Sequence, residues 1–293
     1  MSKPFFSIII PAFNRAYILT QTIESVLLQT FNDFELIVVD DGSTDNTKEV
    51  VQNILDSRLT YIYQHNAERS VARNNGIRNS KGKYICFLDS DDWYENNHLQ
   101  TLFDRIKTTN FPEALFFTHY YIFHHDNKSV PEIPLMNISP IKYMLKNPVI
   151  PARVCVHHTI LEKFKFREDI VIVEDQVLWT TIAAHYPVFQ IPEFTVVYHL
   201  HEDNSINIKK NCFRPRLEGM NLLFDQTDVG PLISKKEKNE IISNCYYGIA
   251  KHYAFKKDYL KMCLNVFLSL VSDVKSPQTK SKFYMLLYPS KSY

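Results

Sequence analysis

Glycine and cysteine are scarce in this sequence, and both shortages narrow what the chain can be. Only six of its 293 residues are glycine. None of them forms a GxGxxG or GxxxxGK[ST] loop, so neither a dehydrogenase-type dinucleotide fold nor a P-loop is expected. The five cysteines are scattered, and no two form a CxxC pair. This usage predicts reduced, buried thiols rather than a disulfide framework or a zinc site.

Long apolar runs and a strong net charge are also missing. No stretch reaches the roughly 18 apolar residues of a membrane-spanning helix. The apolar run at the N-terminus is too short for a signal peptide and contains Pro11. We therefore expect a cytoplasmic protein, either soluble or held at the inner face of a membrane. The formal net charge of +1 argues against a nucleic-acid partner.

The charges that are present are unevenly distributed. From residue 235 to residue 293, 11 lysines stand against four acidic residues. The body of the chain is therefore acidic and its C-terminal region basic. Two interpretations of that region stay open: a charged, solvated face on packed helices, or a peripheral contact with an anionic membrane surface.

Apolar patterns typical of strands and helices alternate over residues 4–112. Each β-branched run is short and ends at a polar cluster, which favours strands buried on both faces. Strands are expected at 5–11, 34–41, 59–64 and 83–89, and helices at 15–30, 43–56 and 70–82. Such alternation predicts an α/β fold whose parallel sheet is covered by helices on both faces.

The pattern is less regular after residue 112. Aromatic alternation predicts a strand at 114–125, and the proline-rich stretch 130–140 predicts a loop. Further elements are expected as a strand at 152–160, a helix at 174–186, a strand with its exit loop at 194–207, and two or three helices after residue 215.

The fourth expected strand runs directly into an acidic cluster. The sequence "YICFLDSDDWY" places Asp89, Ser90, Asp91 and Asp92 in succession. Carboxylates this close repel each other unless a positive charge lies among them. Ligands of open parallel sheets bind at the carboxyl ends of the strands, where "PAFNR" and "DDGSTDNT" also fall. Two acidic clusters at one such edge favour a hard divalent cation, Mg²⁺ or Mn²⁺.

The spacing of the acidic residues argues against two other kinds of site. An aspartyl-phosphate phosphatase needs two aspartates separated by one residue, whereas Asp40 and Asp41 are adjacent in "VVDDGST". The stretch "DGSTDNT" also lacks the glycine and glutamate that a calcium loop requires at its sixth and twelfth positions. Neither site is therefore expected.

Four motifs in order resemble the inverting glycosyltransferases of family 2, which have the GT-A fold. They are "SIIIPAFNR", "QTFNDFELIVVDDGSTDNT", "ARNNGIRNSKGKYICFLDSDDWY" and "VEDQVLW". The resemblance is close over about 95 residues and thins by about residue 205. It implies a nucleotide-binding half at 1–112 with a mostly parallel sheet, a smaller acceptor-binding half at 113–210, and a helical basic region at 211–293.

The resemblance also implies a nucleotide-sugar donor, usually a UDP-sugar, bound with Mn²⁺ or Mg²⁺. Asp89 and Asp91 match the DxD motif, with Asp92 beside them as a further metal candidate. One departure from the family is Glu68, which stands where a glycine is common. The residues that match donor-binding positions are Pro11, Ala12, Phe13, Asn14, Asp40, Asp41, Arg73, Asp89, Ser90 and Asp91.

The catalytic base is expected in the acidic pair that begins the helix after "VIV". An inverting transfer is a single displacement, and one carboxylate must take the proton of the acceptor hydroxyl. The resemblance assigns this role to Asp175, with Glu174 in support. An acidic residue at a helix N-terminus that only complements the helix dipole is the alternative interpretation.

Five further residues are weaker candidates. His199 and His201 are candidates for the metal shell or for a contact with the diphosphate, and only one of them can face that site because they alternate along a strand. His157, His158 and Trp179 are candidates for the acceptor side, although a tryptophan at that helical spacing also suits the core.

Together these features predict an enzyme of the hexosyl- or N-acetylhexosaminyl-transferase class. Its acceptor is expected to be a glycan or a lipid-linked glycan in bacterial surface polysaccharide synthesis. The QxxRW motif of processive synthases is absent, since "QVLW" lacks the arginine, so single additions are expected. Two alternatives stay open: a nucleotidyltransferase that makes nucleotide-sugars, and a non-catalytic sugar- or partner-binding protein on the same fold.

Overall fold

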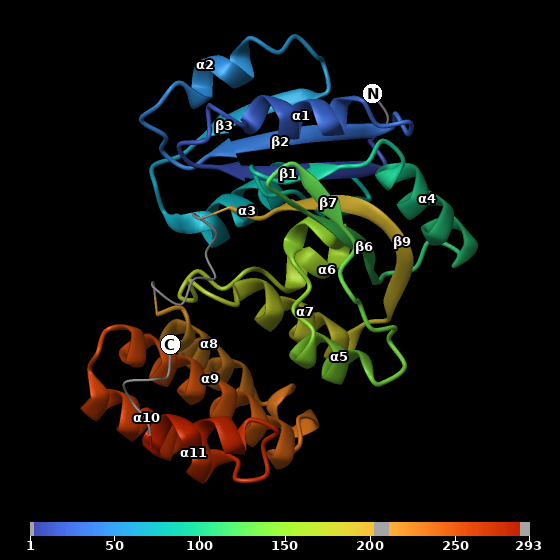
Figure 1. Cartoon of the computed structure of the whole chain (residues 1–293). Coiled ribbons are helices and arrows are strands. Elements are labelled where there is room, and N and C mark those ends of the chain that lie inside the picture. Colours follow the sequence, from blue (N-terminus) through green and yellow to red (C-terminus); the bar gives the residue numbers. More distant parts are fainter. Residues whose placement is uncertain (1–2, 202–210, 288–293) are drawn as a thin grey trace. The chain divides into compact units, whose positions relative to one another are not determined.

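The computed structural model describes residues 3–201 and 211–287. The chain divides into two compact units. The first contains residues 1–169 and 178–201, and the second contains residues 170–177 and 202–293. Each unit is described by itself below, and Figure 1 labels the elements of both.

The first unit is built around one sheet, whose strand order in the described residues is β3-β2-β1-β4-β8-β6-β9-β5, with β7 paired to β6. Its first four strands are parallel, which confirms the expected sheet. They are β1 (Phe6–Ala12), β2 (Phe34–Asp40), β3 (Leu59–Tyr63) and β4 (Tyr84–Phe87).

Helices cover both faces of these parallel strands (Figure 1). Alternate residues of β1 point to opposite faces because the side-chain period of a strand is two. Ile8 and Ile10 pack in the same core cluster as the buried side of α1, whereas Ile9 packs with Ala72 and Ile77 of α3. The helices of this part are α1 (Leu19–Leu27), α2 (Thr47–Gln52), α3 (Glu68–Asn79) and α4 (His98–Thr108).

The second half of the sheet has mixed strand directions, because β8 runs against β4 while β6 and β9 run the same way as β4. Strand β8 (Val154–His157) is antiparallel to β4 and to β6 (Leu115–His124). Strand β9 (Val188–His199) runs parallel to β6, and the two-residue strand β5 (Trp93–Tyr94) pairs antiparallel with β9. The remaining elements are β7 (Asn127–Ser129), α5 (Pro140–Lys146), η1 (Pro151–Arg153), α6 (His158–Lys163) and α7 (Glu174–His185), whose first four residues are assigned to the second unit.

Several of these elements differ from expectation. The strand expected at 152–160 is shorter, because α6 begins at His158, and neither α5 nor β7 was predicted. Strands β9 and β5 differ as well. Strand β9 begins at Val188, six residues before the expected start. Of the expected exit loop, residues 202–207 lie outside the described part of the chain. The short strand β5 was not predicted at all, because two residues carry no periodic signal. Both differences matter for the site, since β5 and β9 bring the end of the acidic motif next to residues near 200.

The second unit is helical, as expected for the C-terminal region. Helix α9 begins with a capping box, in which Ser234 and Glu237 exchange side-chain-to-backbone hydrogen bonds. Gly248 lets α8 approach α9, because a Cβ there would lie 2.2 Å from the Phe213 ring. Its helices are α8 (Phe213–Phe224), η3 (Gly230–Leu232), α9 (Lys235–Phe255), α10 (Tyr259–Ser272) and α11 (Thr279–Leu287).

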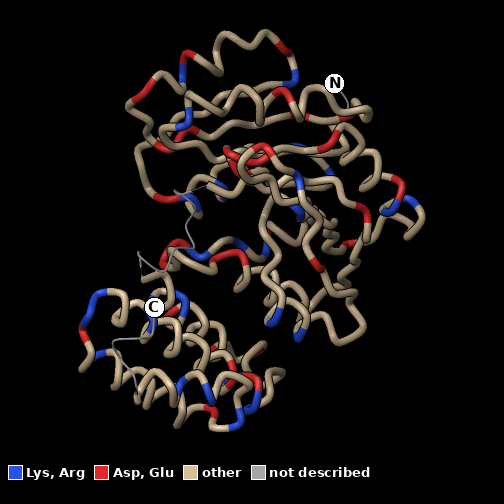
Figure 2. Tube along the Cα trace, viewed as in Figure 1, with Lys and Arg blue, Asp and Glu red and all other residues tan. Residues whose placement is uncertain are grey.

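Lysines and arginines are distributed along these helices, as Figure 2 shows. In the described part of the chain, no helix combines the length and the apolar character needed to cross a membrane.

Candidate functional site

The loops that follow β1 and β2 are joined by hydrogen bonds. The backbone N–H of Asn14 donates to Ser43 Oγ at 2.9 Å, and the N–H of Thr44 donates to Asn14 Oδ1 at 2.8 Å. Asn14 has a φ of 53°, in the left-handed region that asparagine tolerates better than most residues. The strand end at Pro11–Asn14 therefore lies beside the Asp40–Asp41 loop, as the shared edge of the sheet predicts.

Both carboxylate oxygens of Asp40 accept hydrogen bonds from within the protein. Its Oδ1 accepts the N–H of Ser43 at 2.8 Å, and its Oδ2 accepts the hydroxyl of Tyr61 at 2.6 Å. Burial, together with the bond to Asp40, raises the pKa of Tyr61 and keeps that hydroxyl a donor. Asp40 thus holds the turn after β2 in shape.

Asp41 keeps more accepting capacity than Asp40. Its Oδ1 accepts from Gln64 Nε2 at 2.7 Å and from the N–H of Ala67 at 2.9 Å. Its Oδ2 has one long contact, at 3.4 Å from Asn66 Nδ2. A ligand N–H directed at Oδ2 would find an acceptor there, so the geometry permits the donor-binding role that the resemblance implies for Asp41, which stays a prediction.

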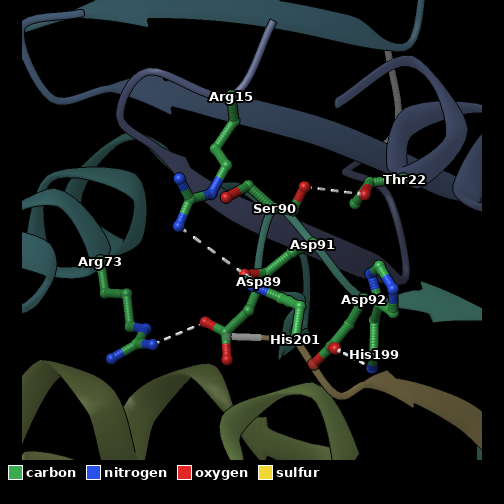
Figure 3. Close-up of polar contacts among 9 residues, drawn as sticks. All are labelled: Arg15, Thr22, Arg73, Asp89, Ser90, Asp91, Asp92, His199 and His201. Carbon is green, nitrogen blue, oxygen red and sulfur yellow. Dashed lines mark hydrogen bonds and ion pairs between the residues drawn. The ribbon is translucent and has the colours of Figure 1, made fainter. Parts of the chain in front are cut away.

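The three acidic residues after β4 have different partners, which Figure 3 shows. Asp89 forms an ion pair with Arg73, whose Nη2 lies 2.7 Å from Asp89 Oδ1. Arg73 is 2% exposed, and its guanidinium lies 5.2 Å from the centre of the Phe166 ring. The expected cation among the acids is therefore, in part, this buried arginine.

Asp91 is the residue of the cluster that faces His201. Its Oδ2 lies 2.9 Å from His201 Nε2 and 3.8 Å from Arg15 Nη2 (Figure 3). The side chains of Asp91 and His201 each keep 18% of their surface exposed. This pair is thus both close together and accessible to solvent.

Asp92 lies in a different environment from its neighbour. It is 1% exposed; its Oδ1 accepts the backbone N–H of His199 at 2.9 Å, and its Oδ2 has no hydrogen-bond partner. Burial raises the pKa of Asp92 well above its usual range, and the nearby charges of Asp89 and Asp91 add to the shift. The metal-ligand role stays a prediction, and the geometry favours a role in holding β9.

Of the two histidines at the end of β9, His201 contacts the acidic cluster. The His199 ring instead packs 5.8 Å from Trp93 and 5.7 Å from Phe123, measured between ring centres. The two rings lie 5.2 Å apart, measured between centres, and the metal role of either histidine stays a prediction. Asp92 holds the backbone at His199, two residues before His201, so it also helps to place the second imidazole.

The pair formed by Asp91 and His201 fits part of a divalent-metal shell. Asp91 Oδ2 and His201 Nε2 are hydrogen-bonded at 2.9 Å. Neighbouring ligands at the ~2.1 Å bond length of an octahedral ion would lie about 3 Å apart, so such an ion would accept the same separation. Over residues 3–201 and 211–287, no group of three or more His, Cys, Asp or Glu side chains converges on one point. The remaining ligands of such an ion would come from diphosphate oxygens and water.

Glu174 and Asp175 begin α7, as the sequence predicts. Glu174 is buried, and Asp175 is partly exposed. Asp175 Oδ1 accepts the N–H of Gln176 at 2.7 Å. The preceding residue, Val173, has a φ of 68°, which is costly for a β-branched side chain and is typical of strained turns at functional sites.

The acceptor-side candidates receive no support from the geometry. His157 pairs with Tyr84 at the first residue of β4, and His158 Nδ1 lies 2.9 Å from the carbonyl of Gly82. Because β8 runs antiparallel to β4, both histidines lie at the edge opposite Asp89. Trp179 is fully buried, with its Nε1 donating to the Val149 carbonyl at 3.0 Å, so it is part of the core.

Three residues that contact the candidate aspartates were not predicted from the sequence. Arg15 approaches Asp91, and Gln64 and Asn66 donate to Asp41. Arg15 had a signal, because it is the only cation of the "PAFNR" motif. Ser90 is held through its carbonyl, which accepts the hydroxyl of Thr22 at 3.0 Å.

Comparison with protein families gives one match, to the family described as glycosyl transferase family 2, over residues 7–170. The "GalNAc(5)-diNAcBac-PP-undecaprenol beta-1,3-glucosyltransferase" of Campylobacter jejuni is 27% identical over 287 residues, which cover 94% of this chain and 91% of that protein. Several other curated relatives, among them glycosyltransferases of Streptococcus pneumoniae and Rickettsia, are longer, and the match spans only 20 to 30% of their length.

Solved structures show the same fold at low sequence identity. Staphylococcus aureus TarS in complex with UDP-GlcNAc matches with a TM-score of 0.67 at 16% identity, over 99% of this chain and 89% of that one. The mannosyltransferase PcManGT of Pyrobaculum calidifontis, in complex with GDP-Man and Mn²⁺, matches with a TM-score of 0.60 at 15% identity, over 100% of this chain and 88% of that one. The expected GT-A fold is confirmed.

Proposed function

The chain belongs to glycosyl transferase family 2, and on that premise we propose that it transfers a sugar from a nucleotide-sugar to a hydroxyl group, with inversion. The donor we propose is a UDP-sugar, of the hexose or N-acetylhexosamine class. The observation that carries the proposal is the accessible pair of Asp91 and His201 at the carboxyl ends of the strands. This is where an α/β sheet binds its ligands.

The nucleotide is held, in this proposal, by the loops after β1, β2 and β4. Asp41 offers its Oδ2 to the base, and the backbone at Pro11–Asn14 packs along the nucleoside. TarS has been solved with UDP-GlcNAc and with UDP, and PcManGT with GDP-Man. Those ligands are consistent with a donor site on the shared fold.

Asp91 and His201 would hold Mn²⁺ or Mg²⁺, which when bound neutralises the charge that develops on the leaving diphosphate. Arg15 lies 3.8 Å from Asp91 and adds a positive charge next to the place where the diphosphate would bind. Arg73 is already paired with Asp89, so it balances that carboxylate and positions the loop. Asp89 and Asp92 are kept as weaker metal candidates.

Asp175 is the proposed base, and Glu174 supports it. In the transfer, the acceptor oxygen forms a bond to the anomeric carbon while the bond from that carbon to the diphosphate oxygen breaks. Asp175 takes the acceptor proton, and the electron pair leaves with the nucleoside diphosphate. A base of this kind contributes about 10²- to 10⁴-fold to the rate.

For the acceptor, we propose a glycan or a lipid-linked glycan of a bacterial surface polysaccharide. The name of the Campylobacter relative refers to an undecaprenol-linked substrate of that protein, which supports the lipid-linked choice. We place the enzyme on the cytoplasmic side, in peripheral contact with the membrane through residues 211–293, its helical basic region. The acceptor half is proposed at 113–210 and the nucleotide half at 1–112.

Calorimetric titration with UDP and with GDP tests the donor site. We expect UDP to bind the wild type only with Mn²⁺, and Asp91→Ala and His201→Ala each to weaken binding by at least about tenfold, through the loss of one metal ligand. Asp104→Ala, which removes an exposed carboxylate of α4, is the matched control and should bind like the wild type.

The other outcomes favour the alternatives. Failure of both nucleotides to bind under any condition would reject the donor site and favour a non-catalytic binding protein. Release of pyrophosphate from a sugar phosphate and a nucleoside triphosphate would favour the nucleotidyltransferase.

A further inference from the structure

Helix α10 carries apolar side chains on two opposite faces. Met262, Val266 and Leu270 are buried in the core of the second unit. The opposite face is apolar as well, but solvent reaches it. This outer stripe consists of Leu260, Leu264, Phe267 and Val271, which are 87, 56, 60 and 65% exposed.

The spacing of the outer stripe makes it one continuous line. Steps of four, three and four residues bring side chains to the same side of an α-helix. On the surface of a soluble helix this line is normally polar, and an aligned set of exposed apolar residues marks a surface that something covers. With 14 residues, α10 is too short to cross a bilayer. Whatever covers the stripe must therefore contact α10 along this one face, without being spanned by the helix.

The surroundings of the stripe are basic. Lys256 and Lys257 precede α10, Lys261 lies in its first turn, and Lys275 and Lys280 follow it; all five are exposed. Over residues 255–287 the acidic residues are Asp258 and Asp273, and Asp258 is already paired with Lys261 at 2.9 Å. The segments before and after the stripe thus carry an excess of positive charge.

We propose that the outer stripe of α10 lies in the surface of an anionic lipid membrane. Leu264 and Phe267 would enter the boundary between head groups and acyl chains, and the lysines would contact the lipid phosphates. Helix α11 adds two exposed apolar residues one turn apart, Phe283 and Leu287, which are 52 and 72% exposed.

A second copy of the chain fits this surface less well. A two-fold symmetric dimer places the same patch on both sides of its interface. Such an interface would bring the lysines near the stripe close to the lysines of the second copy, whereas anionic lipid neutralises them. The charge therefore selects lipid over self-association.

This inference deepens the proposed function, because a lipid-linked acceptor would present its sugar at the same membrane surface. It rests on the membrane contact proposed for residues 211–293, but its test is independent of the donor site and of the transfer reaction. Lipid binding is measured without donor, metal or turnover, so a failed nucleotide titration and a failed lipid assay report on different proposals.

The test is co-sedimentation of the full chain with vesicles of phosphatidylcholine alone and of phosphatidylcholine mixed with phosphatidylglycerol. The stripe variant is Leu264→Ser combined with Phe267→Ser. Its control is Leu55→Ser, which changes a leucine that is 96% exposed in the first unit. The charge variant is Lys256→Gln combined with Lys275→Gln. Circular dichroism shows whether each variant is folded, and light scattering gives the oligomeric state.

We expect binding to anionic vesicles that is weakened about tenfold or more in the stripe variant and by about fivefold for each lysine removed. The Leu55→Ser control should bind like the wild type. Wild-type protein that ignores anionic vesicles, or a folded stripe variant that binds them fully, overturns the proposal. A wild-type dimer that becomes monomeric in the stripe variant, without vesicle binding, identifies a second copy as the partner instead.

Discussion

Asp91 and Asp92 are neighbours in the sequence but have opposite surroundings. The side chain of Asp91 is accessible and contacts His201, whereas Asp92 is 1% exposed and accepts the backbone N–H of His199. A charged carboxylate is costly to bury, and burial raises the pKa of Asp92 accordingly. Two adjacent aspartates thus serve different purposes: one faces the site, and the other holds the strand that supplies its partner.

Substitution of Asp92 tests this division. In Asp92→Asn the amide oxygen can still accept the N–H of His199, so we expect stability close to wild type and unchanged UDP binding with Mn²⁺. In Asp92→Ala the buried N–H loses its acceptor, which should cost about 1–3 kcal/mol and weaken UDP binding by displacing His201. Urea unfolding and calorimetry measure the two effects. Equal behaviour of the two variants would contradict the positioning role.

Glu68 shows how one residue can depart from its family without disturbing the loop. It has a φ of 73°, in the left-handed region that glycine adopts without strain. The glycine that is common at this position suits the same backbone. The adjacent N–H of Ala67 still donates to Asp41 at 2.9 Å, so the loop keeps its contact with the site.

At the scale of elements, α4 is joined to β9 through one buried histidine. His98 begins α4 and is fully buried; its Nδ1 lies 2.7 Å from Thr195 Oγ1, and its ring stacks on Tyr94 with 3.9 Å between centres. Burial lowers the pKa of His98 to about 3. The helix is therefore held against the sheet by a neutral imidazole.

This contact predicts a loss of stability in acid. The unfolded chain protonates this histidine near pH 6.5, whereas the folded protein does so only near pH 3. Between these values the unfolded state binds more protons, so stability falls as the pH decreases below about 6.5. From pH 7 to pH 5 this one group should cost about 2 kcal/mol.

Urea unfolding at the two pH values measures that loss. His98→Gln should reduce the difference by about 2 kcal/mol, although its stability at pH 7 will also change. The control is His65→Gln, which removes an exposed histidine and should leave the pH dependence as it is. A pH dependence identical in wild type and His98→Gln would show that the group titrates normally in the folded state.

At the scale of the whole molecule, binding and chemistry should be separable by substitution. Asp175→Asn keeps an oxygen that can accept the N–H of Gln176, so the start of α7 should stay folded. We expect UDP binding like the wild type and a fall in turnover of about 10²- to 10⁴-fold, because the acceptor proton loses its base. UDP release with membrane-extracted glycolipids as acceptors measures the rate.

The matched control is Asp169→Asn, which changes a carboxylate that is 58% exposed and paired with Arg167. It should leave turnover unchanged. If Asp175→Asn also turned over at the wild-type rate, the base would have to be another residue, and the helix-dipole interpretation of this acid would be preferred.

The parallel half of the sheet and its polar strand ends could be predicted from the sequence because their signals are local. Each buried run, each helical repeat and each acidic cluster lies within a few residues, and the side-chain period of a strand or helix gives its type. Four ordered motifs, three within residues 7–94 and one at 173–179, then indicated the family that the comparison confirms. By contrast, no such local pattern predicts strand β5 or the early start of strand β9.

The tertiary structure decided which of these polar residues meet. His201 lies 110 residues beyond Asp91 in the chain and reaches it because β9 pairs with both β6 and β5. His157 and His158 were expected near the acceptor, but the antiparallel pairing of β8 with β4 puts them at the other edge of the sheet. Strand pairing between distant segments depends on packing of the whole sheet and leaves no mark in the local sequence. The sequence by itself therefore determined the kinds of side chain at the site, and only the fold decided their partners.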